Sequence, residues 1–192
     1  PDQSSAASDV YKRQVYDRVA LIGLGLIASS IFWASKRNGV SGYVAGFSRS
    51  KQTRDTAKKI GLCDEVFDTV EDAVKDADLV ILCVPVGAME QVMLDIAPFL
   101  KTGATISDVG SVKRAVIDAV EPHLPTDVKF VPAHPLAGTE HSGPESGFAS
   151  LFDNRWCLLT DHGSADKEAQ NKVINFWKSL GANVEFMDAD HH

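Results

Sequence analysis

The sequence predicts an α/β protein of the Rossmann-like, doubly wound class, with a mostly parallel sheet and helices on both of its faces. Three observations support this fold class. Segments typical of strands and of helices alternate along the whole chain. A G-x-G-x-x-A turn at residues 23–28 follows the first strand and opens a helix. Residues 79–84 form a continuous apolar run, as expected for a central parallel strand that is buried on both faces.

Each predicted element follows a periodic apolar pattern or is bounded by turn residues. The predicted strands are short apolar runs at residues 18–22, 43–47, 65–67, 79–84, 104–107, 128–131, 156–160 and 184–187. The predicted helices occupy residues 26–36, 52–60, 70–75, 87–100 and 165–180. One more helix is predicted to start within residues 108–113. Gly61 is a natural C-cap for the second helix, and Pro85 ends the fourth strand. Residues 132–147 are rich in Pro, Gly and His and are predicted to be a loop.

The composition is that of an ordinary globular domain. The 192 residues are 44% hydrophobic and 23% charged, which is enough apolar material for one sizeable core. The net charge is −7 and no basic stripe is present, so a nucleic-acid partner is not expected. No apolar run is long enough for a membrane helix. The three cysteines are scattered, without C-x-x-C or metal-ligand spacing, which predicts no metal site and fits a reducing cytoplasm.

The two ends of the chain differ from the rest. Residues 1–14 are polar and small, and they are expected to be a non-native or disordered leader. Residues 15–192 are expected to form the dinucleotide-binding domain. Residues 188–192, which end in His191 and His192, come directly after the last predicted strand, so no further domain is expected within this chain.

The glycine turn predicts binding of NAD or NADP. Gly23 can make the tight turn, and Gly25 leaves the backbone open to a pyrophosphate. The small Ala28 lets the helix pack on the strand, while Leu26 and Ile27 begin the helix whose free N–H groups face the anion. The alternative is a glycine-rich turn in another kind of α/β protein.

The residues after the second strand favour NADP over NAD. An NAD site usually places an acidic residue here, which accepts a hydrogen bond from the ribose 2′-hydroxyl. This chain has Ser48, Arg49 and Ser50, then Lys51, and a hydroxyl with a guanidinium suits a 2′-phosphate better. The alternatives are a site that accepts both cofactors, or charges that are only solvated at a helix start.

Open α/β sheets bind ligands beyond the carboxyl ends of their strands. Three further segments end strands at this edge: residues 84–86, 108–113 and 133–143. Val84, Pro85 and Asp108 are therefore predicted to join the glycine turn in holding the cofactor.

His134 is the strongest candidate for proton chemistry, because it directly follows a predicted strand end. A neutral imidazole there can accept the proton of a substrate hydroxyl while hydride leaves the carbon. The alternative is a structural histidine with satisfied hydrogen bonds. His141 is the weaker catalytic candidate, because it lies farther from the strand end.

Ser111, Lys113 and Glu140 each have two interpretations. Ser111 belongs to the site, or it is the N-cap of the helix that follows. Lys113 binds a ligand, or it is a surface charge, although a cation in the first turn opposes the helix dipole. Glu140 orients His134 or Lys113, or it is simply solvated.

Taken together, these segments resemble the prephenate and arogenate dehydrogenase family, also called cyclohexadienyl dehydrogenases. The resemblance lies in the glycine turn, in Val84-Pro85-Val86, in D-V-G-S-V-K at residues 108–113 and in H-P-L-A-G-T-E-H-S-G at residues 134–143. It spans residues 17–192, and the last two motifs are far more specific than the glycine turn.

The resemblance implies an enzyme of tyrosine biosynthesis. Such an enzyme oxidatively decarboxylates prephenate to 4-hydroxyphenylpyruvate, or arogenate to tyrosine, with hydride transfer to NAD(P). By the same resemblance, His134 looks like the residue that polarises the ring hydroxyl, and Ser111 looks like its hydrogen-bonding partner at the substrate. Lys113 and Glu140 look like supporting residues that bind the substrate.

The chain departs from the family pattern in three ways. Ala28 stands where a third glycine is usual, and Ala133 stands where a glycine often precedes the histidine. The family's helical C-terminal domain, which dimerises and supplies an arginine for a substrate carboxylate, has no match in this sequence. The chain alone is therefore expected to bind cofactor with little turnover, and a homodimer is expected only with that domain. The rival interpretations are an NAD(P)-binding module without turnover and another dehydrogenase of the β-hydroxyacid dehydrogenase type.

Overall fold

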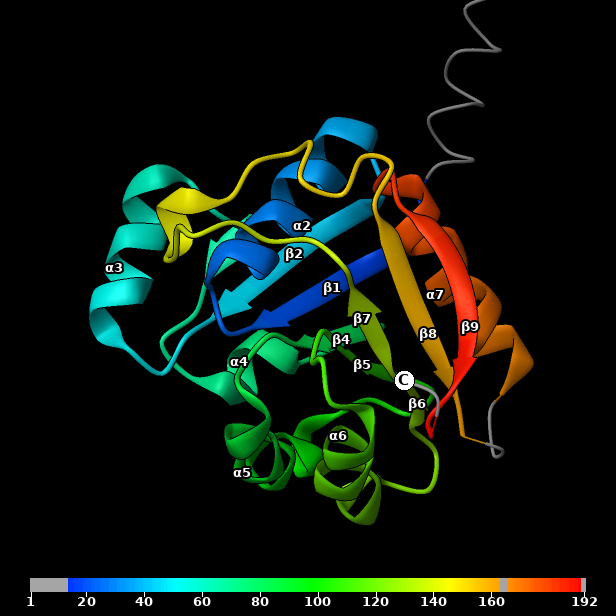
Figure 1. Ribbon diagram of the computed structural model, residues 1–192. Coiled ribbons are helices and arrows are strands. Elements are labelled where there is room, and N and C mark those ends of the chain that lie inside the picture. Colours follow the sequence, from blue (N-terminus) through cyan, green and yellow to red (C-terminus); the bar gives the residue numbers. More distant parts are fainter. Residues whose placement is uncertain (1–13, 163–165, 191–192) are drawn as a thin grey trace, which may run out of the picture.

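A six-stranded parallel sheet forms the centre of the structure, a computed structural model that describes residues 14–162 and 166–190. The strand order is β3-β2-β1-β4-β5-β6 (Figure 1). The strands are β1 (Tyr16–Ile22), β2 (Ser41–Phe47), β3 (Glu65–Val66), β4 (Leu79–Leu82), β5 (Thr105–Asp108) and β6 (Lys129–Val131). The expectations for residues 1–13 and 191–192 concern segments outside the described residues.

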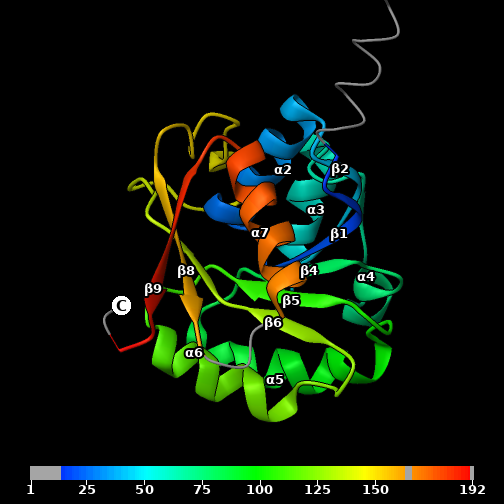
Figure 2. The same cartoon turned by 90° about the vertical axis from the view of Figure 1, so that its right-hand side faces the viewer.

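Helices cover both faces of this sheet, as predicted. Helices α2 (Leu26–Asn38), α3 (Lys51–Ile60) and α7 (Lys167–Ser179) share one apolar core with it. Helices α4 (Val70–Val74), α5 (Val86–Ile96) and α6 (Lys113–Val120) share the other core (Figure 2). The predicted doubly wound fold class is therefore confirmed.

Strand β1 shows why the central strands are continuously apolar. Val19 and Leu21 are buried in the core that contains α2. Ala20 and Ile22, which alternate with them, are buried in the core that contains α5. Successive side chains of a strand point to opposite faces, so a strand between two helical layers has no solvent-facing position.

The strand order reverses between β1 and β4. The chain moves outward from β1 through β2 to β3, and then returns to place β4 on the other side of β1. In open α/β sheets such a reversal leaves a crevice at the carboxyl ends of the two strands, where ligands bind. The residues after β1 and β4 therefore border this crevice.

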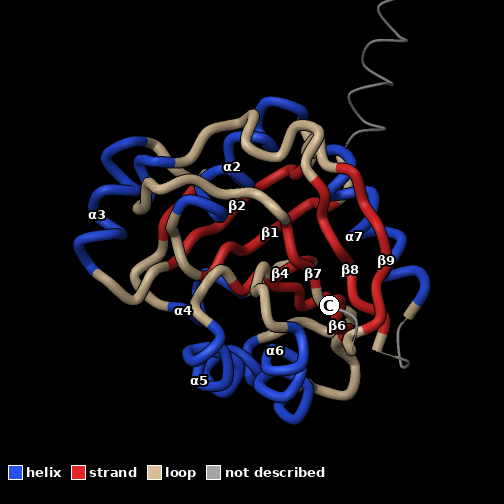
Figure 3. Tube along the Cα trace, viewed as in Figure 1, coloured by secondary structure: helices blue, strands red, loops and turns tan. Residues whose placement is uncertain are grey.

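The last three strands form a second sheet, which the alternating pattern did not predict. Its order is β7 (Ala133–Pro135), β8 (Trp156–Asp161) and β9 (Asn183–Asp188), with β7 antiparallel and β9 parallel to β8 (Figure 3). The prediction of an uninterrupted loop at 132–147 is wrong for β7. Pro132 has no N–H for the ladder of the large sheet, and its carbonyl instead accepts from Thr160 N at 3.1 Å.

Two predicted helix boundaries also need correction. The helix predicted at 87–100 ends at Ile96, and a 3₁₀ turn over Ala97–Phe99 follows, because Pro98 cannot continue the α-helical hydrogen bonds. Helix α6 begins at Lys113, and its N-cap is Val112 without any side-chain cap. The interpretation of Ser111 as an N-cap is therefore wrong.

Within the described residues, no helix combines the length and the apolar character that crossing a membrane requires.

Candidate functional site

The glycine turn lies at the carboxyl end of β1, in contact with the residues after β4. Gly23 has a φ of 94°, which favours glycine, and its N–H donates to Phe47 O at 2.8 Å. A Cβ at Gly23 would lie 2.6 Å from the Cys83 carbonyl oxygen and 2.9 Å from a Val84 methyl carbon. The fold itself therefore requires a glycine at this position, and the turn is packed against the segment that carries Val84 and Pro85.

Gly25 is different, because none of the described residues occupies the space beside it. It is the N-cap residue of α2, with φ −98° and ψ −157°, a conformation that other residues adopt readily. A Cβ built there meets no atom within 4 Å. The absence of a side chain at Gly25 is thus not explained by packing, and it leaves the backbone open to a ligand.

The start of α2 is suited to an anion. It has no side-chain cap and no acidic residue in its first turn, so its first N–H groups lack the usual side-chain partners. Leu26 and Ile27 are half-buried, while Ala28 is fully buried against the sheet. Together with Gly25, this arrangement fits the pyrophosphate of a dinucleotide.

The end of β2 carries the residues predicted to select the cofactor. Ser48 is half-buried and Arg49 is exposed. The guanidinium of Arg54 donates to the carbonyl oxygens of both, at 2.8 Å and 3.1 Å, and so holds the backbone of this turn. Ser50 caps α3 by accepting from Thr53 N. The turn therefore has a defined shape that presents the Arg49 side chain to solvent.

Asp108 and Lys113 form a buried ion pair at the carboxyl end of β5. Neither side chain has any exposed surface. One carboxylate oxygen of Asp108 accepts from Lys113 Nζ and from Gly110 N at 2.8 Å, and the other accepts from Ala133 N at 3.1 Å. Burial raises the pKa of Asp108 and lowers that of Lys113, while their mutual attraction opposes both shifts.

The direct ligand contacts predicted for the side chains of Asp108 and Lys113 therefore need correction. The charged ends of both side chains are fully buried, so in this structure neither can reach a cofactor or a substrate carboxylate. The interpretation of Lys113 as a surface charge is equally wrong, because its side chain is fully buried and its ammonium pairs with Asp108.

Ser111 and His134 are the two predicted catalytic residues, and the ion pair brings their backbones together. Ser111 is exposed in the turn between β5 and α6, directly after Gly110. His134 is half-buried on β7, directly after Ala133 and opposite Leu158 of β8. Since Gly110 and Ala133 both donate to the Asp108 carboxylate, the two residues that follow them are held at the same edge of the sheet.

Glu140 lies away from the ion pair. Its side chain is 85% exposed, and its carboxylate is 3.5 Å from the ring of His141, which is also exposed. The expectation that it orients Lys113 is wrong, because the Lys113 side chain is fully buried and its ammonium donates to Asp108 and the Ala133 carbonyl. A role for Glu140 in binding substrate stays a prediction.

The segment after β7 is fastened to helix α2, which the sequence did not reveal. It reaches α2 and α3 at the carboxyl edge of the sheet (Figure 1). The buried Ser29 hydroxyl donates to Pro144 O at 2.5 Å, and the buried Ser30 hydroxyl accepts from Phe148 N at 3.1 Å. The only available signal was a pair of polar residues on a helix whose buried positions are otherwise mostly apolar.

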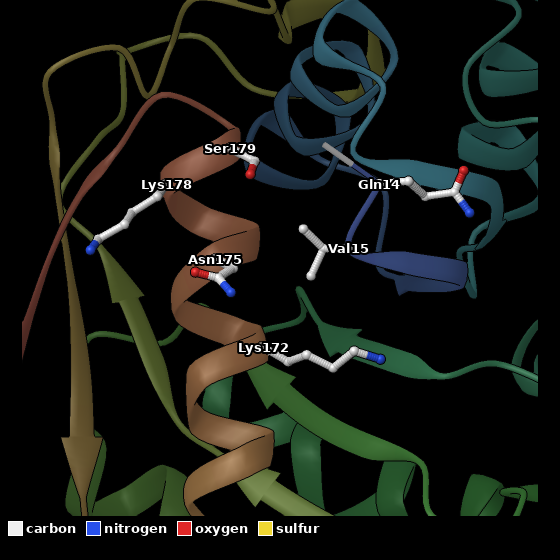
Figure 4. A pocket seen from close by; sticks show the side chains of 6 residues that line it. All are labelled: Gln14, Val15, Lys172, Asn175, Lys178 and Ser179. Atoms are coloured by element: carbon white, nitrogen blue, oxygen red, sulfur yellow. The ribbon is translucent and has the colours of Figure 1, made fainter. Parts of the chain in front are cut away.

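A separate pocket lies far from this edge, between the start of β1 and α7 (Figure 4). It is lined by Gln14, Val15, Lys172, Asn175, Lys178 and Ser179. The ammonium groups of Lys172 and Lys178 point in opposite directions (Figure 4). The ammonium of Lys172 lies over the ring of Tyr16, 4.8 Å from its centroid. The two cations do not converge, so the pocket lacks the geometry of an anion site. Within the described residues, no cluster of three metal-ligating side chains occurs.

The parallel sheet reverses its strand order beside the glycine turn, where Gly25 leaves open space and the N-terminus of α2 has no side-chain cap. These features define a dinucleotide-binding domain of the Rossmann class. Comparison with known proteins identifies the family. The nucleotide-binding domain of prephenate dehydrogenase matches residues 33–186. The chain therefore belongs to the prephenate dehydrogenase family, and the resemblance noted in the sequence is confirmed.

Individual relatives agree with this assignment. The chain is 42% identical to the cyclohexadienyl dehydrogenase of Zymomonas mobilis over 178 residues, which cover 93% of this chain and 60% of that protein. It is 33% identical to the prephenate dehydrogenase of Bacillus subtilis, covering 93% of this chain and 48% of that protein. The chain thus spans about half to three fifths of the length of these relatives.

Solved structures of prephenate and arogenate dehydrogenases also resemble this chain. The Aquifex aeolicus prephenate dehydrogenase, in complex with hydroxyphenyl propionate and NAD⁺, superimposes with a TM-score of 0.84 and 30% identity. The match covers 92% of this chain and 61% of that one. The Synechocystis arogenate dehydrogenase superimposes with a TM-score of 0.79 and 27% identity, over 91% of this chain and 61% of that one.

Proposed function

We propose that the whole protein is an NAD(P)-dependent dehydrogenase that oxidatively decarboxylates prephenate, arogenate or both in tyrosine biosynthesis. Membership of the family and the names of the relatives support this activity. The observation that carries it is the joint placement of Ser111 and His134. A single buried carboxylate holds the residues before both, at the same sheet edge as the open glycine turn.

In this proposal the cofactor is held by the glycine turn and by the ends of the neighbouring strands. The N–H groups that begin α2 bind the pyrophosphate, and Gly25 allows its approach. Val84 and Pro85 border the crevice, since Val84 packs beside the turn and Pro85 caps α5. The bound nicotinamide supplies the acceptor for hydride.

The protein's own contribution to the chemistry centres on His134. Its imidazole accepts the proton of the ring hydroxyl as hydride leaves the same ring carbon. Ser111 donates or accepts a hydrogen bond at that hydroxyl and so keeps it in line with the imidazole. The ring carboxylate then leaves as carbon dioxide, the ring becomes aromatic, and the proton returns to the ring oxygen. Aromatisation makes the second step strongly favourable.

We propose NADP rather than NAD as the preferred cofactor. No acidic side chain follows β2, and Arg49 extends from a turn whose backbone is held by Arg54. A guanidinium is well matched to a 2′-phosphate. We also propose that the enzyme is cytoplasmic, in keeping with the free cysteines among the described residues. We propose that dimerisation requires a C-terminal helical domain of the family type.

The test of the activity is steady-state kinetics on the protein at the full length of its relatives, with both substrates and both cofactors. We expect His134→Asn to lower kcat by about 10²- to 10⁴-fold with a modest change in KM, because general-base assistance has this size. The acidic limb of the pH profile should disappear as well. His141→Asn is the matched control, since the His141 side chain is exposed and its ring lies 3.5 Å from the exposed carboxylate of Glu140. A near-normal kcat in His134→Asn would move the catalytic role to another residue.

A further inference from the structure

The side chains of Asp108 and Lys113 are buried, so direct contact with a ligand does not explain why this ion pair is present. Both side chains are fully enclosed, and each ends on partners within the protein. Buried ion pairs are costly, because desolvation of two charges cancels most or all of their attraction. Stability alone is therefore a weak reason for such a pair, and its hydrogen bonds indicate a different role.

On one side, the pair holds the peptide groups around Ala133. The Asp108 carboxylate accepts from Ala133 N at 3.1 Å, and Lys113 Nζ donates to Ala133 O at 2.5 Å. The carbonyl of Ala133 belongs to the peptide plane that leads into His134. Fixing this plane and the one before it fixes the direction in which the His134 side chain leaves the strand. Ala133 itself is fully buried, as expected for the residue that alternates with a half-exposed histidine on β7.

On the other side, the pair holds the turn that carries Ser111. Gly110 N donates to Asp108 at 2.8 Å, two residues along the chain. A Cβ at Gly110 would lie 2.8 Å from a Val116 methyl carbon and 3.1 Å from the Asp108 carboxylate. The turn is therefore packed so closely that its shape depends on the position of this carboxylate.

We propose that Asp108 and Lys113 are positioning residues that set Ser111 and His134 relative to one another, without touching substrate or cofactor. The proposal rests on the proposed function in one respect, namely that Ser111 and His134 act on the substrate hydroxyl. It assigns Lys113 a role different from that of a carboxylate-binding cation. Lysine suits this role because its long stem lets one ammonium group join α6, β5 and β7.

The main test is the double variant Asp108→Asn/Lys113→Met in the full-length protein. It removes both charges together, keeps the volumes close to the original, and avoids leaving one charge buried alone. We expect kcat to fall about 10- to 100-fold, since a small misplacement of a reacting group has an effect of this size. Substrate KM and the dissociation constant of NADP should stay within about threefold, because the pair does not contact either ligand.

A second readout does not depend on turnover. The imidazole signals of His134 in NMR spectra, assigned by their loss in His134→Gln, report its pKa and its surroundings in the free protein. We expect both to change in the double variant. Asp108→Asn/Lys113→Gln is the milder variant, because it also leaves no charge buried alone and keeps a polar group at the end of each side chain. It should give an intermediate loss of kcat if Asp108→Asn/Lys113→Met does not fold.

The matched control is Asp78→Asn/Lys101→Met. Asp78 and Lys101 form an ion pair of the same residue types before β4 and β5, at the amino-end edge of the sheet. This control should leave kcat and the His134 signals unchanged. A folded Asp108→Asn/Lys113→Met protein with the parent's kcat and His134 signals would overturn the proposal. A selective rise in substrate KM would overturn it too, because Lys113 would then be a binding residue. Failure of the proposed function is separate, since it would appear as absent turnover in the parent or a normal kcat in His134→Asn.

Discussion

Two glycines of one turn should respond in opposite ways to a side chain. Gly25→Val should strongly weaken cofactor binding without harming the fold, because a Cβ at Gly25 meets no atom of the described residues within 4 Å. Its φ of −98° and ψ of −157° are acceptable for other residues, and loss of glycine's flexibility in the unfolded chain contributes about 0.4–1 kcal/mol of stability. Gly23→Ala should instead destabilise the protein itself.

The cost at Gly23 has two parts. Its φ of 94° lies in the region that favours glycine, and a non-glycine residue held in such a conformation costs about 1–3 kcal/mol. A Cβ would also lie 2.6 Å from the Cys83 carbonyl oxygen, which is backbone and cannot move aside freely. For a domain of this size, about 1–3 kcal/mol corresponds to a fall in Tm of about 2–12 °C.

The assay is a thermal melt of each protein with and without NADP. A ligand at a hundred times its Kd adds about 2.7 kcal/mol to the parent, or about 5–11 °C in Tm. Loss of one charge-assisted hydrogen bond to the pyrophosphate weakens binding by up to about a hundredfold. At the same NADP concentration, the added stability of Gly25→Val then falls to about 0.4 kcal/mol, or less than about 2 °C.

Either of two results would refute this reasoning. If NADP raises the Tm of Gly25→Val as much as that of the parent, the pyrophosphate does not approach this glycine. Gly25→Val that melts as early as Gly23→Ala without ligand would show that the space beside Gly25 is not open.

Three further changes test other parts of the structure. Arg49→Ala should weaken NADP about ten- to a hundredfold and leave NAD nearly unchanged, because only the 2′-phosphate needs the guanidinium; equal losses in a titration would contradict this. Gly147→Ala should lower the free energy of unfolding by about 1–3 kcal/mol, because the new Cβ would lie 2.3 Å from the Ser29 Cβ, whereas Gly138→Ala has no atom within 4 Å and serves as the control. Asp166→Ala should lower Tm at neutral pH by removing the N-cap of α7. The hydrogen bond from Ala169 N lowers the pKa of the Asp166 carboxyl, so this stabilisation is present above the usual value of 3.8 and is lost as the pH falls through the lowered value. A Tm difference that stays constant down to pH 2 would contradict the assignment.

The site was predictable where a short motif has a local physical requirement. Gly23 and Gly25 could be assigned from the order of strand, turn and helix, because the turn and the helix N-terminus are formed by neighbours in the chain. Asp108 and Lys113 were both predicted to be site residues, yet the sequence did not reveal that they pair with each other. Whether a lysine faces solvent or a carboxylate depends on what packs around it, and Ala133, one of its partners, lies 20 residues away in sequence.

The sequence by itself determined the fold class and the central sheet of this protein. Alternating apolar segments and the continuous run of β4 require a strand covered on both faces, since successive side chains of a strand point in opposite directions. Local patterns of this kind need no knowledge of distant residues. Most element boundaries followed from them to within about two residues, which is as close as helix and strand ends can be defined.

Only the tertiary structure decided how the strands in the last third of the chain pair with one another. Periodicity marks Trp156–Asp161 and Asn183–Asp188 as strands, but it does not say which strands they pair with. They pair in a second sheet with β7, because Pro132 interrupts the ladder of the large sheet and redirects the chain. The position of His134, the burial of Lys113 and the attachment of the following segment to Ser29 and Ser30 all depend on this long-range pairing, for which a single sequence carries no local signal.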